Sequence, residues 1–284
     1  MPESRPRRAA RVVEVLRSER LSASLVRVVV GGDGLATFEP SPFTDSYVKV
    51  VFVDPRVPRP LPRTDDGRVD LDALRDASPP ELAPRMRSYT VREYDAHAGE
   101  LTLDFVVHGD TGVAGPWALA ARPGDEMIFL GPGGGYLPAP EAGRHLLAGD
   151  LSALPAIAVA LDRLPSDATG HVVLEVHGPE DELPLLAPDG VEVTWVHQGD
   201  ERPGARLVEA VRALPWPHDD VHAFVHGEAG AVRELRRHLR LERGLGLDRL
   251  SISGYWRLGV DDEGWRAGKR EWNAAVEQEE SLAS

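Results

Sequence analysis

Residues 145–177 read HLLAGDLSALPAIAVALDRLPSDATGHVVLEVH, and this stretch decides the fold of the second half of the chain. The apolar run His145–Ala148 predicts a strand, Leu154–Leu164 a helix, and His171–His177 a second strand. Alternating strands and helices are typical of an open parallel α/β sheet, whose ligands bind at the carboxyl ends of its strands. The same alternation continues with predicted strands at Val191–His197, Val221–His226 and Leu250–Ser253, and predicted helices at Arg206–Leu214, Ala231–Arg243 and Ala267–Glu280.

The first 140 residues lack this alternation and predict β-structure. Six short runs rich in β-branched residues are separated by turn residues, which predicts an antiparallel six-stranded β-barrel. A break at Ser18–Arg20 ends the first run, and Asp54–Arg85 predicts an exposed loop with one helical turn near Leu71–Arg75. The predicted strands are Arg11–Leu16, Leu25–Val30, Tyr47–Val53, Arg87–Arg92, Leu101–Val107 and Glu126–Leu130.

The pattern changes after Pro138-Ala139-Pro140. We therefore predict a two-domain β + α/β protein, with the barrel domain at residues 8–140 and the α/β domain with its C-terminal helix at 141–284. A chain of 284 residues and 30.9 kDa suits two medium domains.

The charge of the chain limits its partners. A net charge of −14 argues against nucleic acid, and any anionic ligand needs local basic residues. Without cysteine, the chain has no thiolate nucleophile and no cysteine-ligated iron–sulfur cluster, so electron transfer needs an organic cofactor or a metal without thiolate ligands. No zinc-protease motif or phosphate loop is present, and we expect no metal site.

No segment of the sequence predicts a membrane helix. The longest apolar stretch, residues 151–161, is 11 residues long, whereas a membrane helix needs about 20. No apolar region follows the arginines of the N-terminus. We therefore expect a cytoplasmic monomer that does not bind membranes.

The tetrapeptide Arg87-Ser88-Tyr89-Thr90 is the first candidate ligand-binding motif. In a strand, Arg87 and Tyr89 share one face, while Ser88 and Thr90 share the other. A guanidinium beside an aromatic ring suits a ligand that carries both a phosphate and a flat ring. The alternative is an ordinary strand with Arg87 on its solvent face.

A second candidate, LDFVVHGDTGVAGPW, spans residues 103–117. Its small residues Ala114 and Gly115 let a backbone approach a ligand closely, and successive amide groups can bind a pyrophosphate. His108 can stack on a base or serve only the structure. Trp117 is better explained as a core residue.

Two further candidates lie at the carboxyl edge of the predicted sheet. In Gly149-Asp150-Leu151-Ser152-Ala153 a strand leads into a helix whose free amides can bind an anion or a ribose, although a capped helix needs no ligand. Trp256 and Arg257 follow the last strand and can cover a flat cofactor, whereas Tyr255 can equally anchor the core.

Lysine is rare in this chain. Among 32 basic residues the lysines are Lys49 and Lys269 alone. Lys49 interrupts an apolar strand, where a charge is unfavourable unless it is paired or faces a ligand. Lys269 lies near Arg266 in the terminal helix.

Taken in order along the chain, these motifs closely resemble the siderophore-interacting protein family, flavoproteins of the ferredoxin–NADP reductase superfamily. The motifs are Arg-x-Tyr-Thr, Asp-Phe-Val-Val-His-Gly, Ala-Gly-Pro-Trp-Ala, Gly-Asp-Leu-Ser-Ala-Leu-Pro-Ala-Ile and Gly-Tyr-Trp-Arg-x-Gly. The resemblance extends from about Arg11 to Trp272. It implies an FAD-binding barrel domain, an NAD(P)H-binding α/β domain and the reduction of ferric siderophores.

The resemblance also implies roles for particular residues. Arg87 would meet the FAD pyrophosphate, Tyr89 would stack on the isoalloxazine, and Thr90, beside Ser88, would lie near its N5 edge. The other cofactor-binding positions would be Asp104, Val106 and His108 on the adenosine or ribityl side, Ala114 and Gly115 at a phosphate, Asp150, Ser152 and Ala153 beside the flavin or nicotinamide, and Trp256 and Arg257 on the flavin's other side.

In the family, basic residues near the flavin hold the anionic ferric siderophore, and Lys49 and Lys269 match two of them. The third position commonly lies in a Gly-Pro-Arg-Gly turn, which here is the uncharged Gly131-Pro132-Gly133-Gly134. Because this turn carries no charge, the role of the third basic residue that holds the siderophore would fall to Arg266 or Arg257.

For the electron donor, the acidic run Glu180-Asp181-Glu182 after the second α/β strand favours NADH over NADPH, and a solvated acidic loop is the alternative. Ferredoxin is another possible donor. Two other functions stay open: a general NAD(P)H:flavin or quinone reductase, and a protein that binds flavin or siderophore without turnover.

Overall fold

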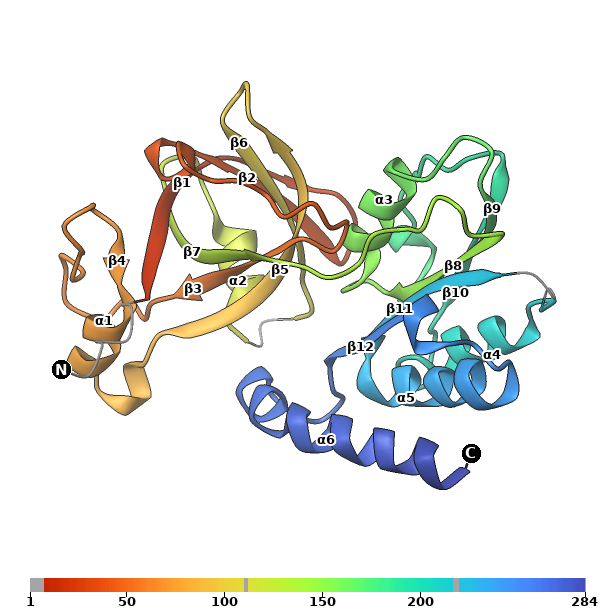
Figure 1. The fold of residues 1–284 in the computed structure, drawn as a ribbon. Helices are drawn as coiled ribbons and strands as arrows, with labels where there is room; N and C mark the ends of the chain where they lie inside the picture. The colour runs from red at the N-terminus through yellow and green to blue at the C-terminus, as the bar shows by residue number, and fades with distance from the viewer. Residues whose placement is uncertain (1–7, 110–111, 217–219, 284) are drawn as a thin grey trace, which may run out of the picture. The chain divides into compact units, whose positions relative to one another are not determined.

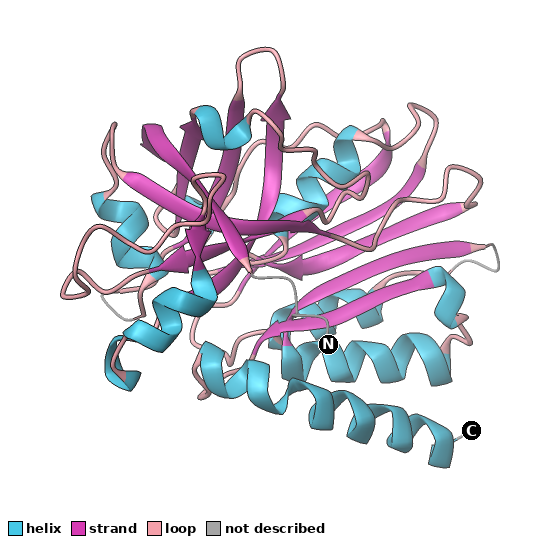
Figure 2. Cartoon of the chain, turned by 60° about the vertical axis from the view of Figure 1, so that its left-hand side comes forward, coloured by secondary structure: helices cyan, strands magenta, loops and turns pink. Residues whose placement is uncertain are grey.

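A computed structural model describes residues 8–109, 112–216 and 220–283 (Figures 1 and 2). The chain forms two compact units. The first contains residues 1–42 and 46–134, and the second contains Phe43–Asp45 and residues 135–284. Phe43–Asp45 joins the second unit through backbone bonds, such as that from Thr44 N to Tyr136 O at 2.8 Å.

The first unit is a closed antiparallel barrel, as predicted. Its strands follow the order β2-β6-β5-β3-β7-β1, and the pairing of β1 with β2 closes the barrel. The two-residue strand β4 pairs with the first residues of β1. Valine, leucine and phenylalanine side chains fill the interior, among them Val28, Val48 and Phe105. The strands are β1 (Ala9–Arg20), β2 (Leu25–Gly31), β3 (Tyr47–Phe52), β4 (Val69–Asp70), β5 (Arg85–Asp95), β6 (Glu100–Val106) and β7 (Glu126–Gly133).

The second unit is a five-stranded parallel sheet with helices, also as predicted. The order β10-β9-β8-β11-β12 reverses direction between β8 and β11, so a topological switch point lies there. The strands are β8 (Arg144–Asp150), β9 (Thr169–Val176), β10 (Gly190–His197), β11 (Val221–Glu228) and β12 (Leu250–Trp256). The helices are α3 (Leu154–Asp162), α4 (Ala205–Ala213), α5 (Ala229–Arg237) and α6 (Asp262–Ala283).

The interior strand β11 shows that this sheet is covered on both faces. All eight of its residues are buried. Val221, Ala223 and Val225 share a core with residues of α4 and α5. His222, Phe224 and His226 therefore face the opposite side of the sheet. Burial on both faces explains why apolar residues occupy both alternating sets of positions in this strand.

Helix α6 lies along α5 (Figure 1). Arg233 pairs with Glu279 through both carboxylate oxygens, and Arg236 pairs with Glu280. Among the helices of the described residues, none is long and apolar enough to cross a membrane.

Several predicted boundaries were wrong. β1 continues to Arg20 through the predicted break, because its charged end pairs with β2 as far as the Arg20–Val26 pair. The helix α2 (Ala114–Ala120) was not predicted from the sequence. It is too short for a helical period to show, and Pro116 falls within its first turn, where proline is tolerated. The helix predicted to end at Arg243 is α5 followed by a π-helical turn at His238–Glu242.

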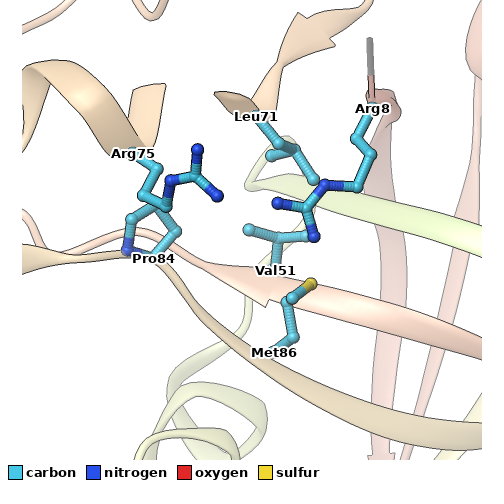
Figure 3. Close-up of a pocket in the computed structure, with 6 residues that line it drawn as sticks. All are labelled: Arg8, Val51, Leu71, Arg75, Pro84 and Met86. Atoms are coloured by element: carbon cyan, nitrogen blue, oxygen red, sulfur yellow. The ribbon is translucent and has the colours of Figure 1, made fainter. Parts of the chain in front are cut away.

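The predicted loop Asp54–Arg85 contains β4 and the helix α1 (Leu71–Ala77), which covers the predicted turn. Asp70 caps α1 by accepting from the amides of Asp72 and Ala73 at 3.1 and 3.0 Å. A pocket of about 50 Å³ lies beside α1 (Figure 3), which is too small for a nucleotide. Its lining residues are Arg8, Val51, Leu71, Arg75, Pro84 and Met86.

Candidate functional site

The Arg87–Thr90 motif lies in the middle of β5. Arg87 is paired with Val50 of β3, and Tyr89 with Val48. Directly opposite residues of antiparallel strands share a face, and both valines are core residues. Arg87 and Tyr89 therefore project together on the core side. Ser88, which is exposed, shares the other face with its partner Lys49.

A series of aromatic rings joins this motif to α2. The ring centroids of Tyr89 and Phe105 lie 4.1 Å apart. The Trp117 ring lies 5.5 Å from that of Phe105 and 5.8 Å from that of Phe52, measured between ring centroids. Trp117 is thus packed against the barrel core, as the sequence indicated. The contacts fix the start of α2 relative to Tyr89.

Ala114 and Gly115 are the first two residues of α2 and are buried. Among the residues that the structure describes, no side chain caps this end of the helix. The first amides of a helix have no partner within the helix, so they can donate to an anion. The predicted phosphate contact of these two residues stays a prediction.

Asp104 has a protein partner that the sequence reasoning missed. Arg27 of β2 lies opposite it in the ladder and donates to its two carboxylate oxygens at 2.7 and 2.8 Å. The pair raises the pKa of Arg27, while the Asp104 side chain is only 5% exposed. Arg27 and Asp104 each interrupt an otherwise apolar strand, and this was the sequence signal that could have revealed the pair. The predicted nucleotide contacts of Asp104, of half-buried Val106 and of exposed His108 stay predictions.

The uncharged residues Gly131–Gly133, which end β7, pass close to Tyr47. A Cβ atom on Gly133 would lie 2.5 Å from a carbon of the Tyr47 ring. At Gly131, with φ +131°, a Cβ would lie 3.1 Å from the Tyr47 carbonyl oxygen. A side chain at Gly133 thus requires the Tyr47 ring to move, which gives a steric reason for the missing basic residue.

In the second unit, Asp150 ends β8 at the switch point. Its carboxylate accepts from the amide and hydroxyl of Ser152 at 2.9 and 2.5 Å. It also accepts from the amide of Glu228 and from the indole Nε1 of Trp256, both at 2.8 Å. Burial raises the pKa of Asp150, and these hydrogen bonds oppose that shift. Asp150 and Ser152, predicted in one motif, and Trp256, predicted in another, are therefore brought together.

The neighbouring residues show how closely this edge is packed. Ala153 is fully buried, and a Cβ on Gly149 would lie 2.5 Å from the Ala153 Cβ and 2.6 Å from the His226 carbonyl oxygen. Trp256 is half-buried, whereas Arg257 is exposed. Ala153 therefore packs against the strand, and its predicted cofactor contact stays a prediction.

Buried carboxylates other than Asp150 were missed. Glu228 is 5% exposed and accepts from the amides of Ala231 and Leu258 at 3.0 and 3.2 Å. Glu175 of β9 accepts from the amides of Gly204 and Leu207. An acidic residue within or at the end of an apolar strand was the signal for both.

Helix α6 carries the predicted basic residues of the second unit. The Lys269 Nζ donates to the Ser253 hydroxyl at 2.9 Å and lies 5.9 Å from the Trp265 ring centroid. Burial lowers the pKa of Lys269. Arg266 is exposed and lies 3.9 Å from a carboxylate oxygen of Asp262.

The structure gives histidine contacts to two members of the acidic run, and the predicted preference for NADH stays a prediction. Asp181 is fully buried, with its carboxylate 3.5 Å from His177 Nδ1. Glu182 is 2.7 Å from His197 Nε2. Among the described residues, no histidine contact is seen for Glu180, the third member of the run. Within the described residues, no group of three or more His, Asp or Glu side chains could hold a metal ion.

Comparison with known proteins identifies the family. The model of the siderophore-interacting FAD-binding domain matches residues 14–136, and the siderophore-interacting protein model matches residues 142–259. The fold and these matches define a flavoprotein of the ferredoxin-reductase-like class. The chain belongs to the siderophore-interacting protein family, and FAD is its cofactor.

Several relatives extend over nearly the whole chain. A Mycobacterium tuberculosis protein, Rv2895c, is 48% identical over 91% of this chain and 94% of its own length. The ferric vibriobactin reductase ViuB of Vibrio cholerae is 35% identical, with coverage of 90% and 92%. The NADPH-dependent ferric-chelate reductase of Escherichia coli is 31% identical, with coverage of 87% and 92%.

Solved structures agree with this assignment. A siderophore utilization protein from T. fusca is 37% identical, covers 89% of this chain and 94% of its own, and superposes with a TM-score of 0.76. A ferredoxin NADP+ reductase from Neisseria gonorrhoeae, at 13% identity and a TM-score of 0.61, covers 88% of this chain and 100% of its own and shares the fold.

The first unit has the donor groups that FAD requires. FAD combines a pyrophosphate with a flat ring, and Arg87 offers a guanidinium beside the ring of Tyr89. Ala114 and Gly115 add amides at an uncapped helix start, held to Tyr89 by the aromatic series. These residues fit the cofactor chemically.

Proposed function

We propose that this protein is a ferric-siderophore reductase that takes electrons from NAD(P)H and delivers them to Fe(III)-siderophore. The supporting observation is that the family's FAD-binding domain matches a barrel in which Arg87 and Tyr89 share one face. ViuB and the Escherichia coli relative are named as ferric reductases. We further propose that the reaction takes place in the cytoplasm and that the protein is a monomer.

The residues of the first unit hold the cofactor. Arg87 and the first amides of α2 bind the pyrophosphate, and Tyr89 contacts the flat ring. FAD, when bound, accepts a hydride from a reduced nicotinamide and passes electrons on one at a time. No side chain of the protein has to transfer a proton for the iron to be reduced.

The basic residues Lys49, Lys269 and Arg266 attract the anionic ferric complex. In a chain of net charge −14, such a complex is repelled unless positive charge is concentrated locally. One NAD(P)H carries two electrons and reduces two ferric ions. Fe(II) binds siderophore oxygens more weakly than Fe(III), so the reduction releases the metal.

The test is an anaerobic absorbance experiment on the purified FAD-loaded protein. NADH or NADPH should bleach the oxidised flavin spectrum, and a ferric siderophore should restore it faster than a quinone does. A flavin spectrum that neither nucleotide changes, but that reduced ferredoxin bleaches, would replace the donor. A spectrum that no donor changes would leave a binding protein, and faster reoxidation by quinone would identify a general reductase.

Charge variants test the substrate site in the same assay. Lys49→Gln and Lys269→Gln should each raise KM for a ferric siderophore about tenfold, with flavin reduction unchanged. Arg122→Gln, which changes an exposed arginine in the barrel unit, is the matched control. Equal KM values for all three variants would refute the assignment of the lysines.

A further inference from the structure

Within the part of the chain that the structure describes, Asp150 is a buried carboxylate whose hydrogen-bond donors include no cation. Its four donors are the Ser152 amide and hydroxyl, the Glu228 amide and the Trp256 indole. Three of the four bonds are 2.8–2.9 Å long. In each of them the donor directs its hydrogen at a carboxylate oxygen. The site therefore requires a side chain that only accepts hydrogen bonds. The side-chain amide of an asparagine at position 150 would direct its own N–H groups toward some of these donors.

The backbone around Asp150 is adapted to this carboxylate. Gly227 of β11 has φ +143°, and a Cβ there would lie 2.5 Å from Asp150 Oδ2. Only glycine adopts this conformation readily and leaves room for the oxygen. The ladder between β11 and β12 is irregular at the same point, and it pairs Glu228 with Trp256.

The consequence of this arrangement is a fixed indole. Trp256 ends β12, and its Nε1 donates to Asp150 Oδ2 at 2.8 Å. Just beyond it, the Leu258 amide donates to Glu228 Oε1 at 3.2 Å. The side chain of Trp256 and the backbone after it are therefore each attached to a carboxylate, although Trp256 itself is half-buried and Arg257 exposed.

The charge at this edge decides which part of a nucleotide it can accept. Parallel α/β sheets bind ligands at the carboxyl ends of the strands beside the switch point. Here Asp150 and Glu228 stand at that edge, so a pyrophosphate is repelled. The nicotinamide ring is flat and carries no phosphate, so it suits an indole face at this edge.

We propose that Asp150 is a positioning residue that fixes the Trp256 indole as the contact surface for the nicotinamide ring of the electron donor. This inference rests on the proposed function, because it assumes a nicotinamide donor. Asp150 acts through the indole and does not itself touch the nucleotide.

The experiment titrates NAD+ and NADP+ into the FAD-loaded protein and measures each Kd by calorimetry, so it does not depend on turnover. Asp150→Asn removes the charge, and Trp256→Phe keeps a ring but removes the N–H donor. Each should weaken the tighter-binding nucleotide about tenfold, the effect of one charge-assisted hydrogen bond. In the Trp256→Phe background, Asp150→Asn should add less than about twofold.

Glu175→Gln is the matched control. Glu175 is also buried and lies beside Asp150 in the β8–β9 ladder, and its donors among the described residues are backbone amides. It should change Kd less than twofold. If Asp150→Asn does not fold, Trp256→Phe breaks the same bond with the carboxylate intact.

Three results would overturn the inference: Kd values in Asp150→Asn and Trp256→Phe within twofold of the wild type, additive losses in the double variant, or an equal loss in Glu175→Gln. Failure of the proposed function gives a different result. In that case neither nucleotide binds the wild-type protein, or ferric siderophore is not reduced although the variants alter Kd as expected.

Discussion

His226 makes the α/β unit sensitive to acid. The imidazole is buried in β11 and stacks on Phe224 with ring centroids 3.9 Å apart. Burial, aided by the positive charge of Lys269, lowers its pKa to about 3. In the unfolded chain the same imidazole takes up a proton near its ordinary pKa of about 6.5.

The sign of the effect follows from proton binding. Because the pKa is lower in the folded state, the unfolded state binds more protons between pH 6.5 and 3, so stability falls as the pH falls through that window. At pH 7.5 the effect is below about 0.1 kcal/mol, and at pH 5 it reaches about 2 kcal/mol, the value for 1.5 pH units below the unfolded-state pKa.

The variant His226→Phe isolates this effect. Phenylalanine keeps a ring against Phe224 but cannot titrate. The His226 Nδ1 has no hydrogen-bond partner among the described residues, so the loss is limited to the 3.0 Å contact between Nε2 and the Ser251 hydroxyl. That loss is about 1 kcal/mol and is the same at both pH values.

Urea unfolding at pH 7.5 and 5.0, followed by tryptophan fluorescence, measures the difference. Trp117 is the one tryptophan before residue 134, and the other five of the chain's six lie after it, so the signal reports mainly the α/β unit. Between the two pH values the wild type should lose about 2 kcal/mol more than His226→Phe. Equal losses in the two proteins would refute a buried, neutral His226.

Three further predictions concern single contacts. Arg27→Leu leaves the buried Asp104 carboxylate unpaired and should lower the free energy of unfolding in urea by about 2–4 kcal/mol. Adding Asp104→Leu to this variant should restore most of that loss. An unchanged free energy of unfolding in the single variant would contradict the prediction. Gly149→Ala brings a Cβ within 2.6 Å of a carbonyl oxygen and should destabilise by about 1–3 kcal/mol in thermal unfolding. Gly135→Ala, where the described structure leaves open space, should not, and equal effects would argue against the close packing. Arg87→Leu should weaken FAD binding about 10- to 100-fold in a flavin-fluorescence titration, whereas the exposed Arg85→Leu should not; similar Kd values for both would remove Arg87 from the pyrophosphate site.

The fold class was predictable because each half of the chain repeats one signal many times. Strand–helix alternation in the second half and short β-branched runs in the first leave few other architectures. Boundaries were harder where tertiary pairing overrides local composition. The charged residues 17–20 remain in β1 because β2 offers a partner along their whole length.

The site was predictable as a set of residue types but not as a network. Sequence placed Asp150 and Trp256 in separate motifs 106 residues apart, and only the sheet order brings their side chains to one hydrogen bond. The acidic run at residues 180–182 shows the opposite limit. Its composition suggested ribose recognition, yet burial of Asp181 and the His197 contact of Glu182 could not be read from it.

The two lysines differ from many of the arginines in whether a carboxylate pairs with their charge. Many arginines pair with carboxylates, as Arg27, Arg233 and Arg236 do, so their charges are locally cancelled. Within the described residues, neither Lys49 nor Lys269 lies within ion-pair distance of a carboxylate: Lys49 faces Ser88 in the ladder, and Lys269 donates to Ser253. In a chain of net charge −14, a half-buried cation that no described carboxylate cancels is a local source of positive potential, and this is the basis for proposing each lysine as a contact for an anionic ferric complex. The rarity of lysine therefore matters less than the fact that these two charges are left available.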